Sequence, residues 1–558
     1  METPYSETYN STCFRKMVSI NIATKNFGYN PEYLPAKEEE KVCLKSSRVK
    51  LTNTSLADVI GEFGFFQKIL YFLLWFPAAA MAVGVYASVY MEYTPLYYCD
   101  SGPESDTRFL TSVNLTCSVE DEDDGEGVSC SKWVFDTSVF TRTVISEFEI
   151  VCSSSYLKTF STTIYMSGML FGSFFFGWFG DKFGRKVAFG CTTLLLSAGS
   201  VCTGISPNFS CYVVARFLTS CGGMGLFITT FVIAMEFVGT KYRSLCGIAI
   251  EFPFALGELY VIFLAYIIRD WRVYQLVIGI PFFFFLLYLF KIPESLRWLL
   301  SKGRVVEAKK IVEDIAKFNG TEKPNWSDDD DEYSTKDESK DLSISSLLSH
   351  PALRIRLLIM AFNWVVTTLG YYGLSLNSAR LGDDAFSNFA LTAVMEIPSY
   401  VFCMIFLDIF GRKYILAFSQ ILAGTTCILA AIIPHSSDAM FYLGTSLALL
   451  GKFGASAGFA IVYVFTAELF PTPVRNSALG LCSTFARVGG ILAPVVSDLG
   501  VYAPSIPFII TGSCCCLGGL AALLLPDTSG SPLPDTVEEA CRVDNSKTET
   551  EEKLNQNC

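Results

Sequence analysis

The chain has 558 residues, of which 51% are hydrophobic and only 17% charged, and its mean hydropathy is +0.40. That balance is too apolar for a soluble protein of this length and predicts an integral membrane protein. The net charge of −12 gives no reason to expect nucleic-acid binding. Two histidines in the whole chain argue against histidine-based catalysis and a metal site. Since no GxSxG, HExxH, phosphate-loop or dinucleotide-binding motif stands in a suitable context, we expect neither an enzyme nor a bound cofactor.

The chain begins with a polar segment, residues 1–66, that lacks a short apolar core followed by a small-residue cleavage site. This pattern does not fit a signal peptide, so we expect a cytoplasmic N-terminal extension.

Apolar runs long enough to cross a bilayer then recur twelve times, which predicts an all-α membrane protein. The expected spans are 67–91, 157–179, 187–206, 211–235, 245–268, 273–292, 356–375, 387–407, 414–433, 440–467, 477–500 and 505–525. They form one group of six at 67–292 and another at 356–525. A polar linker at 293–355, expected to hold amphipathic helices and an acidic disordered part, separates them, and a tail follows at 526–558.

Lysine and arginine in the short loops predict the orientation. "DKFGRK", "GTKYR", "SKGR" and "DIFGRK" all fall on one side, which is therefore expected to be cytoplasmic together with both termini. The long loop at 92–156 is then extracellular. An even number of cysteines in this oxidising compartment predicts two disulfides, for which three pairings can be drawn. The four residues are Cys99, Cys117, Cys130 and Cys152, and Asn114 begins a glycosylation sequon in the same loop.

The two groups of spans repeat each other. "DKFGRK" (Asp181 to Lys186) is echoed by "DIFGRK" (Asp408 to Lys413), and each is followed two spans later by a Glu-x6-Arg pattern. Two similar six-span halves are typical of a transporter built from repeats, with its site at their interface.

Several motifs resemble those of known transporters. "GWFGDKFGRK" has the form of the loop between helices two and three of the major facilitator superfamily, and "IPESLRWLLSKGR" resembles the PESxRWL sequence of its sugar and organic-ion carriers. "EFVGTKYRS", "YYGLSLN", "AELFPTPVRNSALG" and "PDTSGSPLPDTVEEA" are similar to sequences of the organic cation/anion/zwitterion transporter family of solute carriers. The resemblance covers about residues 56–540 and looks closest to the carnitine/zwitterion and organic cation branch. It implies the superfamily fold: twelve transmembrane helices in two six-helix halves.

Charged residues at the cytoplasmic helix ends are expected to latch one conformation through ion pairs without touching substrate. These conformational gating candidates are Asp181, Arg185, Glu236, Arg243, Glu294, Arg297, Asp408, Arg412, Glu468 and Arg475.

Two charges are predicted near the bilayer midplane. Arg487 lies 12 residues past Arg475, roughly 18 Å deep, and Glu396 lies 12 residues before Asp408, at a similar depth. Charges at this depth usually face a cavity or each other. We interpret them as a two-ended substrate site, with Arg487 for a carboxylate and Glu396 for a cationic group. The alternative is an Arg–Glu pair that only joins helices.

The resemblance sharpens this interpretation. Cation-selective members have an acid at the position of Arg487, whereas anion exchangers have an arginine there and usually a lysine at the position of Tyr400. This chain combines the acid of one group with the arginine of the other, and a zwitterion such as carnitine or a related betaine would satisfy both charges. Trp364 and Tyr371 share a helix face and match aromatic substrate-site positions of the family. Phe227 and Phe254 match more loosely.

Aromatic faces bind quaternary ammonium groups through cation–π attraction, although an aromatic core explains such residues equally well. Glu251, in span five, falls on a family substrate-site position. Glu258 is a candidate for binding substrate, a coupling sodium ion or a proton, while Lys452 and Tyr463 are further candidates.

Together these features predict a multi-pass plasma-membrane transporter that moves small organic cations or zwitterions by alternating access, with one chain in the bilayer as the transport unit. One rival is an organic anion exchanger that uses Arg487 and Lys452. Others are a polyspecific cation uniporter and a non-transporting receptor with the same fold.

Overall fold

The computed structural model describes residues 63–99, 118–120, 127–130, 132–239, 242–321, 349–377, 385–433 and 437–528. Several predictions fall outside this part of the chain: the N-terminal extension up to residue 62, Asn114, Cys117, the acidic part of the linker and most of the C-terminal tail. The side chains of Arg243 and Cys99 also lie outside it.

The structure has helical segments at all twelve predicted spans. The first half contains α4 (Phe65–Met91), α6 (Tyr156–Phe183), α7 (Arg185–Gly204), α8 (Phe209–Phe237), α9 (Arg243–Ala249) with α10 (Phe252–Ile267), and α11 (Trp271–Gly279) with the 3₁₀ segment η3 (Ile280–Phe290). The second contains α15 (Pro351–Asn377), α16 (Ala385–Phe410), α17 (Arg412–Ile432), α18 (Asp438–Leu469), α19 (Thr472–Asp498) and α20 (Ser505–Ala522). Within the described residues, eleven spans are apolar and long enough to cross a membrane, and α6, which packs against α8 and α19, is the twelfth.

Two spans that the sequence predicts as continuous are broken. Span five divides at Ile250 and Glu251 into α9 and α10, just before Pro253. Span six changes from α11 to η3 next to Pro281. Proline removes a backbone donor and clashes with the preceding turn, so each break has a local cause. The first break places the carboxylate of Glu251 at a helix end in the middle of the protein.

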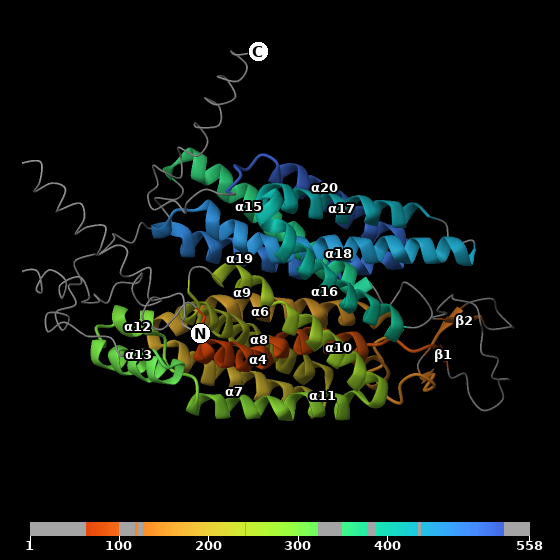
Figure 1. Cartoon of the computed structure of the whole chain (residues 1–558). Helices are drawn as coiled ribbons and strands as arrows, with labels where there is room; N and C mark the ends of the chain where they lie inside the picture. Colours follow the sequence, from red (N-terminus) through yellow and green to blue (C-terminus); the bar gives the residue numbers. More distant parts are fainter. Residues whose placement is uncertain are drawn as a thin grey trace, which may run out of the picture.

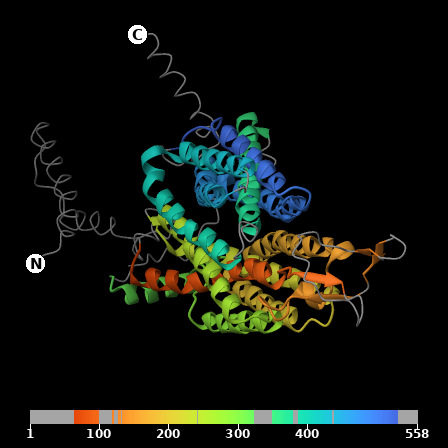
Figure 2. The same ribbon diagram turned by 90° about the vertical axis from the view of Figure 1, so that its right-hand side faces the viewer.

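The helices form two bundles, one above the other in Figure 1 and separated again in the end-on view of Figure 2. The first half holds α4 to η3 and the second α15 to α20. The bundles meet where α6 packs against α19 and α10 against α16. This interface lies between helices far apart in sequence, and it carries most of the predicted site residues.

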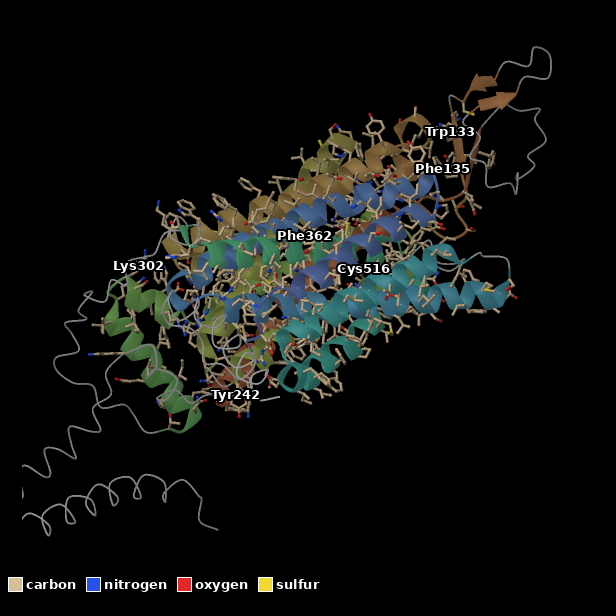
Figure 3. The ribbon with its side chains drawn as sticks, turned by 90° about the horizontal axis from the view of Figure 1, so that it is seen from above. Trp133, Phe135, Tyr242, Lys302, Phe362 and Cys516 are labelled. Carbon is tan, nitrogen blue, oxygen red and sulfur yellow. The ribbon has the colours of Figure 1, made fainter. Side chains whose placement is uncertain are left out.

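Different secondary-structure elements lie at the two ends of the bundles. Helices α12 (Leu296–Ser301) and α13 (Val305–Asn319) cover one end, and two small antiparallel sheets lie at the other. These sheets pair β1 (Tyr97–Cys99) with β4 (Trp133–Phe135) and β2 (Ser118–Glu120) with β3 (Gly127–Ser129). Figure 3 shows Lys302 at the opposite end from Trp133 and Phe135, so a basic loop and the long loop lie on different sides.

Glu147, in the short helix α5 (Val144–Glu147), ties the long loop to the first bundle. Its carboxylate accepts hydrogen bonds from Arg272 Nη2 at 2.6 Å and Trp271 Nε1 at 2.7 Å. Burial alone would raise the pKa of Glu147, but these hydrogen bonds and the nearby arginine charges outweigh it and hold the pKa below its ordinary value. Cys130 and Cys152 also carry disulfide bonds in the structure, while the pairing within the loop remains a prediction.

Candidate substrate site between the two halves

A buried ion pair forms the centre of the candidate site. Glu396 Oε1, on α16, lies 2.5 Å from Lys452 Nζ, on α18, and both side chains are fully buried. The hydroxyl of Tyr400, one turn along α16, donates to the other oxygen of Glu396 at 3.0 Å. The structure thus gives Glu396 a partner other than Arg487: among the ion pairs of the described residues, none joins the two. The alternative of a simple Arg487–Glu396 pair is therefore wrong for this conformation.

The ammonium group of Lys452 has two further partners on α15. It donates to Ser375 Oγ at 2.6 Å and lies 3.6 Å from the centroid of the Tyr371 ring. Tyr371 and Ser375 are one turn apart, so one helix face supplies both. A carboxylate and an aromatic face side by side suit a bound organic cation, because they supply charge compensation and cation–π attraction.

Two acids of the first half face this cluster. The Tyr371 hydroxyl donates to Glu258 Oε1, on α10, at 3.3 Å, and the second oxygen of Glu258 has no hydrogen-bond partner in the described part of the chain. Glu251, at the break between α9 and α10, is close enough to both Glu396 and Arg487 for their charges to interact. The site therefore draws its charges from both halves.

Arg487, on α19, is buried with 3% of its surface exposed. Its charge interacts with Glu251, Tyr372 and Tyr463. The Nε donor has no hydrogen-bond partner among the described residues. A guanidinium in this state offers a directed donor to an anionic group of a ligand.

The predicted aromatic residues other than Phe227 form one continuous group. The Trp364 ring lies 4.4 Å from that of Tyr463, and Tyr371 stacks on Phe459 at 5.0 Å. Phe254, from the first half, reaches the Tyr371 ring at 6.1 Å. Phe227 is buried in the first-half core, and no ring contact between described residues includes it.

Four residues of the candidate site were not predicted from the sequence: Tyr86, Tyr372, Ser375 and Phe459. Helical periodicity could have found two of them, because Ser375 is one turn after Tyr371 and Phe459 one turn before Tyr463. Tyr86, on α4, lies 6.1 Å from Phe254 and has no comparable sequence signal.

Rings from both halves close the end of the interface near the two small sheets, which is the predicted outer end (Figure 1). Phe386, near the start of α16, stacks on Tyr90 at 5.1 Å and lies 5.7 Å from Phe140. The guanidinium of Arg269 lies 4.7 Å from the same ring. One turn further, the buried Phe389 contacts Tyr86 at 5.2 Å. In this conformation the outer side of the site is sealed by aromatic packing.

Six of the ten predicted gating residues form two equivalent ion-pair clusters at the other end, here called latches, and their gating role stays a prediction. Arg185 pairs with Asp181 at 2.9 Å and Glu236 at 3.5 Å, and Arg412 pairs with Asp408 at 3.0 Å and Glu468 at 2.9 Å. Each arginine follows a glycine with positive φ, Gly184 or Gly411, a conformation that side chains disfavour. Arg475 instead donates to the backbone oxygen of Phe470, and Arg297 is exposed but within charge range of Glu236.

A carboxylate from the end of each half lies at each latch. Glu294 accepts a hydrogen bond from the Arg185 backbone at 2.8 Å. In the second half a Cβ on Gly411 would meet the Asp527 carboxylate at 2.9 Å, and Thr528 donates to Glu468 at 2.7 Å. "PES" and "PDT" thus occupy matching places. The sequence prediction included Glu294 and missed Asp527 and Thr528.

Comparisons with known proteins identify the family. The model of the family described as "Sugar (and other) transporter" matches residues 70–539. The chain belongs to this family of membrane transporters. An organic cation transporter protein of Drosophila melanogaster is 36% identical to this transporter over 511 residues, with 86% of this chain and 93% of the relative covered. Human organic cation/carnitine transporter 2 is 31% identical, with 87% and 93% covered, and organic anion transporter 3 of Oryctolagus cuniculus is 32% identical, with 88% and 93% covered.

A solved structure gives the same fold. The inward-open xylose transporter XylE of E. coli superimposes with a TM-score of 0.58 at 16% identity, and 84% of this transporter and 98% of XylE are covered. This transporter therefore has the major facilitator superfamily fold. As a member of a transporter family it is not an enzyme, and such transporters need no cofactor.

Proposed function

We propose that this transporter moves small organic cations or zwitterions across the plasma membrane by alternating access, at a site between its two halves. The observation that carries the proposal is the surroundings of the Lys452 ammonium: a carboxylate, Glu396, and an aromatic face, Tyr371, both buried at the centre of the protein. These groups suit a quaternary ammonium group because it needs charge compensation and a polarisable surface but offers no hydrogen-bond donor. The names of the fly and human relatives support the same substrate class.

Arg487 extends the proposal to zwitterions. Its guanidinium is buried, and its Nε donor has no hydrogen-bond partner among the described residues. A carboxylate at one end of a substrate and a quaternary ammonium at the other, as in carnitine, would satisfy Arg487 and Glu396 together. Sodium or proton coupling, with Glu258 as the candidate group, belongs to the same proposal, as do cytoplasmic termini and a single chain as transport unit.

The test is charge-specific uptake. Cells expressing the chain are given labelled carnitine, tetraethylammonium and para-aminohippurate, each with and without sodium. Arg487→Ala should raise the half-saturating concentration of carnitine about 10- to 100-fold, because a hydrogen bond to a charged group contributes about 1.5–3 kcal/mol. Tetraethylammonium, which has no carboxylate, should change by less than about threefold on this argument. Equal losses for both substrates at unchanged surface expression would contradict the assignment.

A second candidate is an organic anion exchanger. It is favoured by Arg487 itself and by the 32% identity to an organic anion transporter. Uptake of para-aminohippurate, without uptake of carnitine or tetraethylammonium, would establish it. Binding of any probe without flux would instead indicate a receptor with this fold.

A further inference from the structure

Lys452 occupies the position that a substrate cation is expected to take. Its ammonium group lies 2.5 Å from Glu396, 2.6 Å from Ser375 Oγ and 3.6 Å from the centroid of the Tyr371 ring. The carboxylate and the aromatic ring are the two groups that a bound quaternary ammonium would also use, whereas the Ser375 hydroxyl serves the N–H donors of Lys452. While Lys452 keeps them, the Glu396 subsite is filled by the protein's own side chain.

A second carboxylate lies within reach of the same ammonium group. Glu258 interacts electrostatically with Lys452, and its Oε2 accepts no hydrogen bond in the described part of the chain. The Tyr371 side chain lies between them, with Lys452 over its ring and Glu258 at its hydroxyl. The Lys452 ammonium, on a flexible four-carbon side chain, thus has two buried carboxylates near it. In this conformation it forms a direct ion pair with Glu396.

We propose that Lys452 is a tethered resident cation, which fills the cation subsite of the empty transporter and moves to Glu258 when a substrate cation displaces it from Glu396. The proposal rests on the proposed function, since it assumes that Glu396 and Tyr371 receive the cationic part of the substrate. The new element is that Lys452 competes with the substrate cation for Glu396, and that Glu258 receives Lys452 when the substrate binds.

The two positions of Lys452 differ in which half of the protein they engage. Glu396 and Lys452 both belong to the second half, so their ion pair does not itself join the two halves. Glu258 is on α10 of the first half, so a Lys452–Glu258 pair would join the halves across the substrate site. Substrate binding would then favour the closed site through a buried ion pair that the empty transporter does not make.

The resident cation should also help the empty transporter to reorient between its two conformations. A buried carboxylate without a partner is costly, so an empty site with Glu396 exposed to the closed interior would resist reorientation. Lys452 compensates Glu396 in the absence of substrate. Removing it should leave exchange of one cation for another intact while slowing the return of the empty transporter.

The experiment uses the purified full chain, alone and reconstituted in vesicles, with tetraethylammonium as the probe. Lys452→Met should bind tetraethylammonium roughly tenfold more tightly or better. If Lys452 occupies the wild-type subsite more than about nine tenths of the time, the apparent affinity for a competing cation is reduced about tenfold, and the substitution removes this competition. Net uptake should fall about tenfold, while exchange continues near the wild-type rate. Lys302→Met, which removes an exposed lysine far from the site (Figure 3), is the matched control and should retain the wild-type affinity within about threefold.

A double substitution separates this role from a structural one. Glu258→Gln should weaken binding of tetraethylammonium in the wild-type background, because Lys452 loses its destination, and should have little effect when Lys452 is already Met. If Lys452→Met does not fold, Lys452→Met/Glu258→Gln is compared with Glu258→Gln, and the same tightening is expected.

Three results would overturn the proposal. These are unchanged affinity after Lys452→Met, parallel loss of exchange and net uptake, or an equal effect of Glu258→Gln with and without Lys452. A wild-type protein that binds para-aminohippurate but neither tetraethylammonium nor carnitine would overturn the proposed function, and this inference with it.

Discussion

At the scale of single residues, the site depends on polar groups whose partners lie on other helices. Trp364 is an example: its ring contacts Tyr463, and its Nε1 donates to Thr466 Oγ1 at 2.9 Å. The Trp364 side chain is fully buried, so loss of this acceptor would leave a donor without water or protein to bind. One hydroxyl therefore fixes the orientation of a ring at the wall of the candidate site.

We predict that Thr466→Val destabilises the transporter by about 1–3 kcal/mol, since a buried donor is left unpaired at nearly unchanged volume. Thermal unfolding of the purified protein in detergent measures the change. Thr466→Ser, which keeps the hydroxyl, is the control and should lie close to the wild type. A Thr466→Val protein as stable as the Ser variant would show that Trp364 does not depend on this bond.

At the scale of secondary-structure elements, short segments outside the bilayer hold the helices in place. Helix α5 has a single turn, too short to be stable alone, yet Glu147 joins it to Trp271 and Arg272 at the start of α11. Arg272 also donates to the backbone oxygens of Gly204 and Ser206, at the end of α7. Three elements of the first half are thus connected through the Glu147–Arg272 pair.

We predict that Glu147→Gln lowers the free energy of unfolding by about 1–3 kcal/mol, because two charge-assisted hydrogen bonds lose their acceptor charge. The folded-state pKa of Glu147 is lowered, so its contribution is complete above the unfolded-state pKa and is lost as the pH falls through the folded-state value. Thermal unfolding at neutral pH should show a lower melting temperature for Glu147→Gln than for the wild type. This difference should disappear as the pH falls through the folded-state pKa of Glu147. A difference in melting temperature that stays constant with pH would contradict the ion-pair explanation.

At the scale of the whole molecule, the two halves are joined at the outer end by rings and latched separately at the other. Phe386 and Phe389 of the second half pack against Tyr86 and Tyr90 of the first. The arginine latches of Arg185 and Arg412 each stay within one half. Opening toward the outside therefore requires the aromatic contacts to separate, and their strength sets how often this happens.

We predict that Phe386→Ala raises the population of the outward-open conformation about fivefold or more. Each aromatic pair contributes about 0.5–1.5 kcal/mol, and the Phe386 ring takes part in several such pairs. The measurement is the rate at which a membrane-impermeant thiol reagent modifies Thr368→Cys, a buried position on α15, above the rate in the same chain without that cysteine. Phe386→Tyr, which keeps a ring, is the control. Equal labelling of the Ala and Tyr variants would show that the ring does not limit opening.

The amino-acid sequence by itself determined the features that depend on local composition. Hydropathy placed all twelve spans because each must be apolar over the bilayer thickness, whatever its neighbours. The repeated "DKFGRK" and "DIFGRK" loops predicted two similar latches because each places an aspartate and an arginine four residues apart at the junction of two helices. The depth of Arg487 and Glu396 followed from the constant rise of a helix.

Only the tertiary structure decided which of these charges meet. Glu396 and Lys452 lie on different helices, and their pairing depends on how α16 and α18 cross and rotate, which core packing sets and no sequence spacing records. The same holds for Glu258 beside Tyr371, and for Asp527 and Thr528 at the second latch. Depth along a helix is a local property, whereas direction around it is fixed by the neighbouring helices, and for this reason the sequence located the charged residues but not their partners.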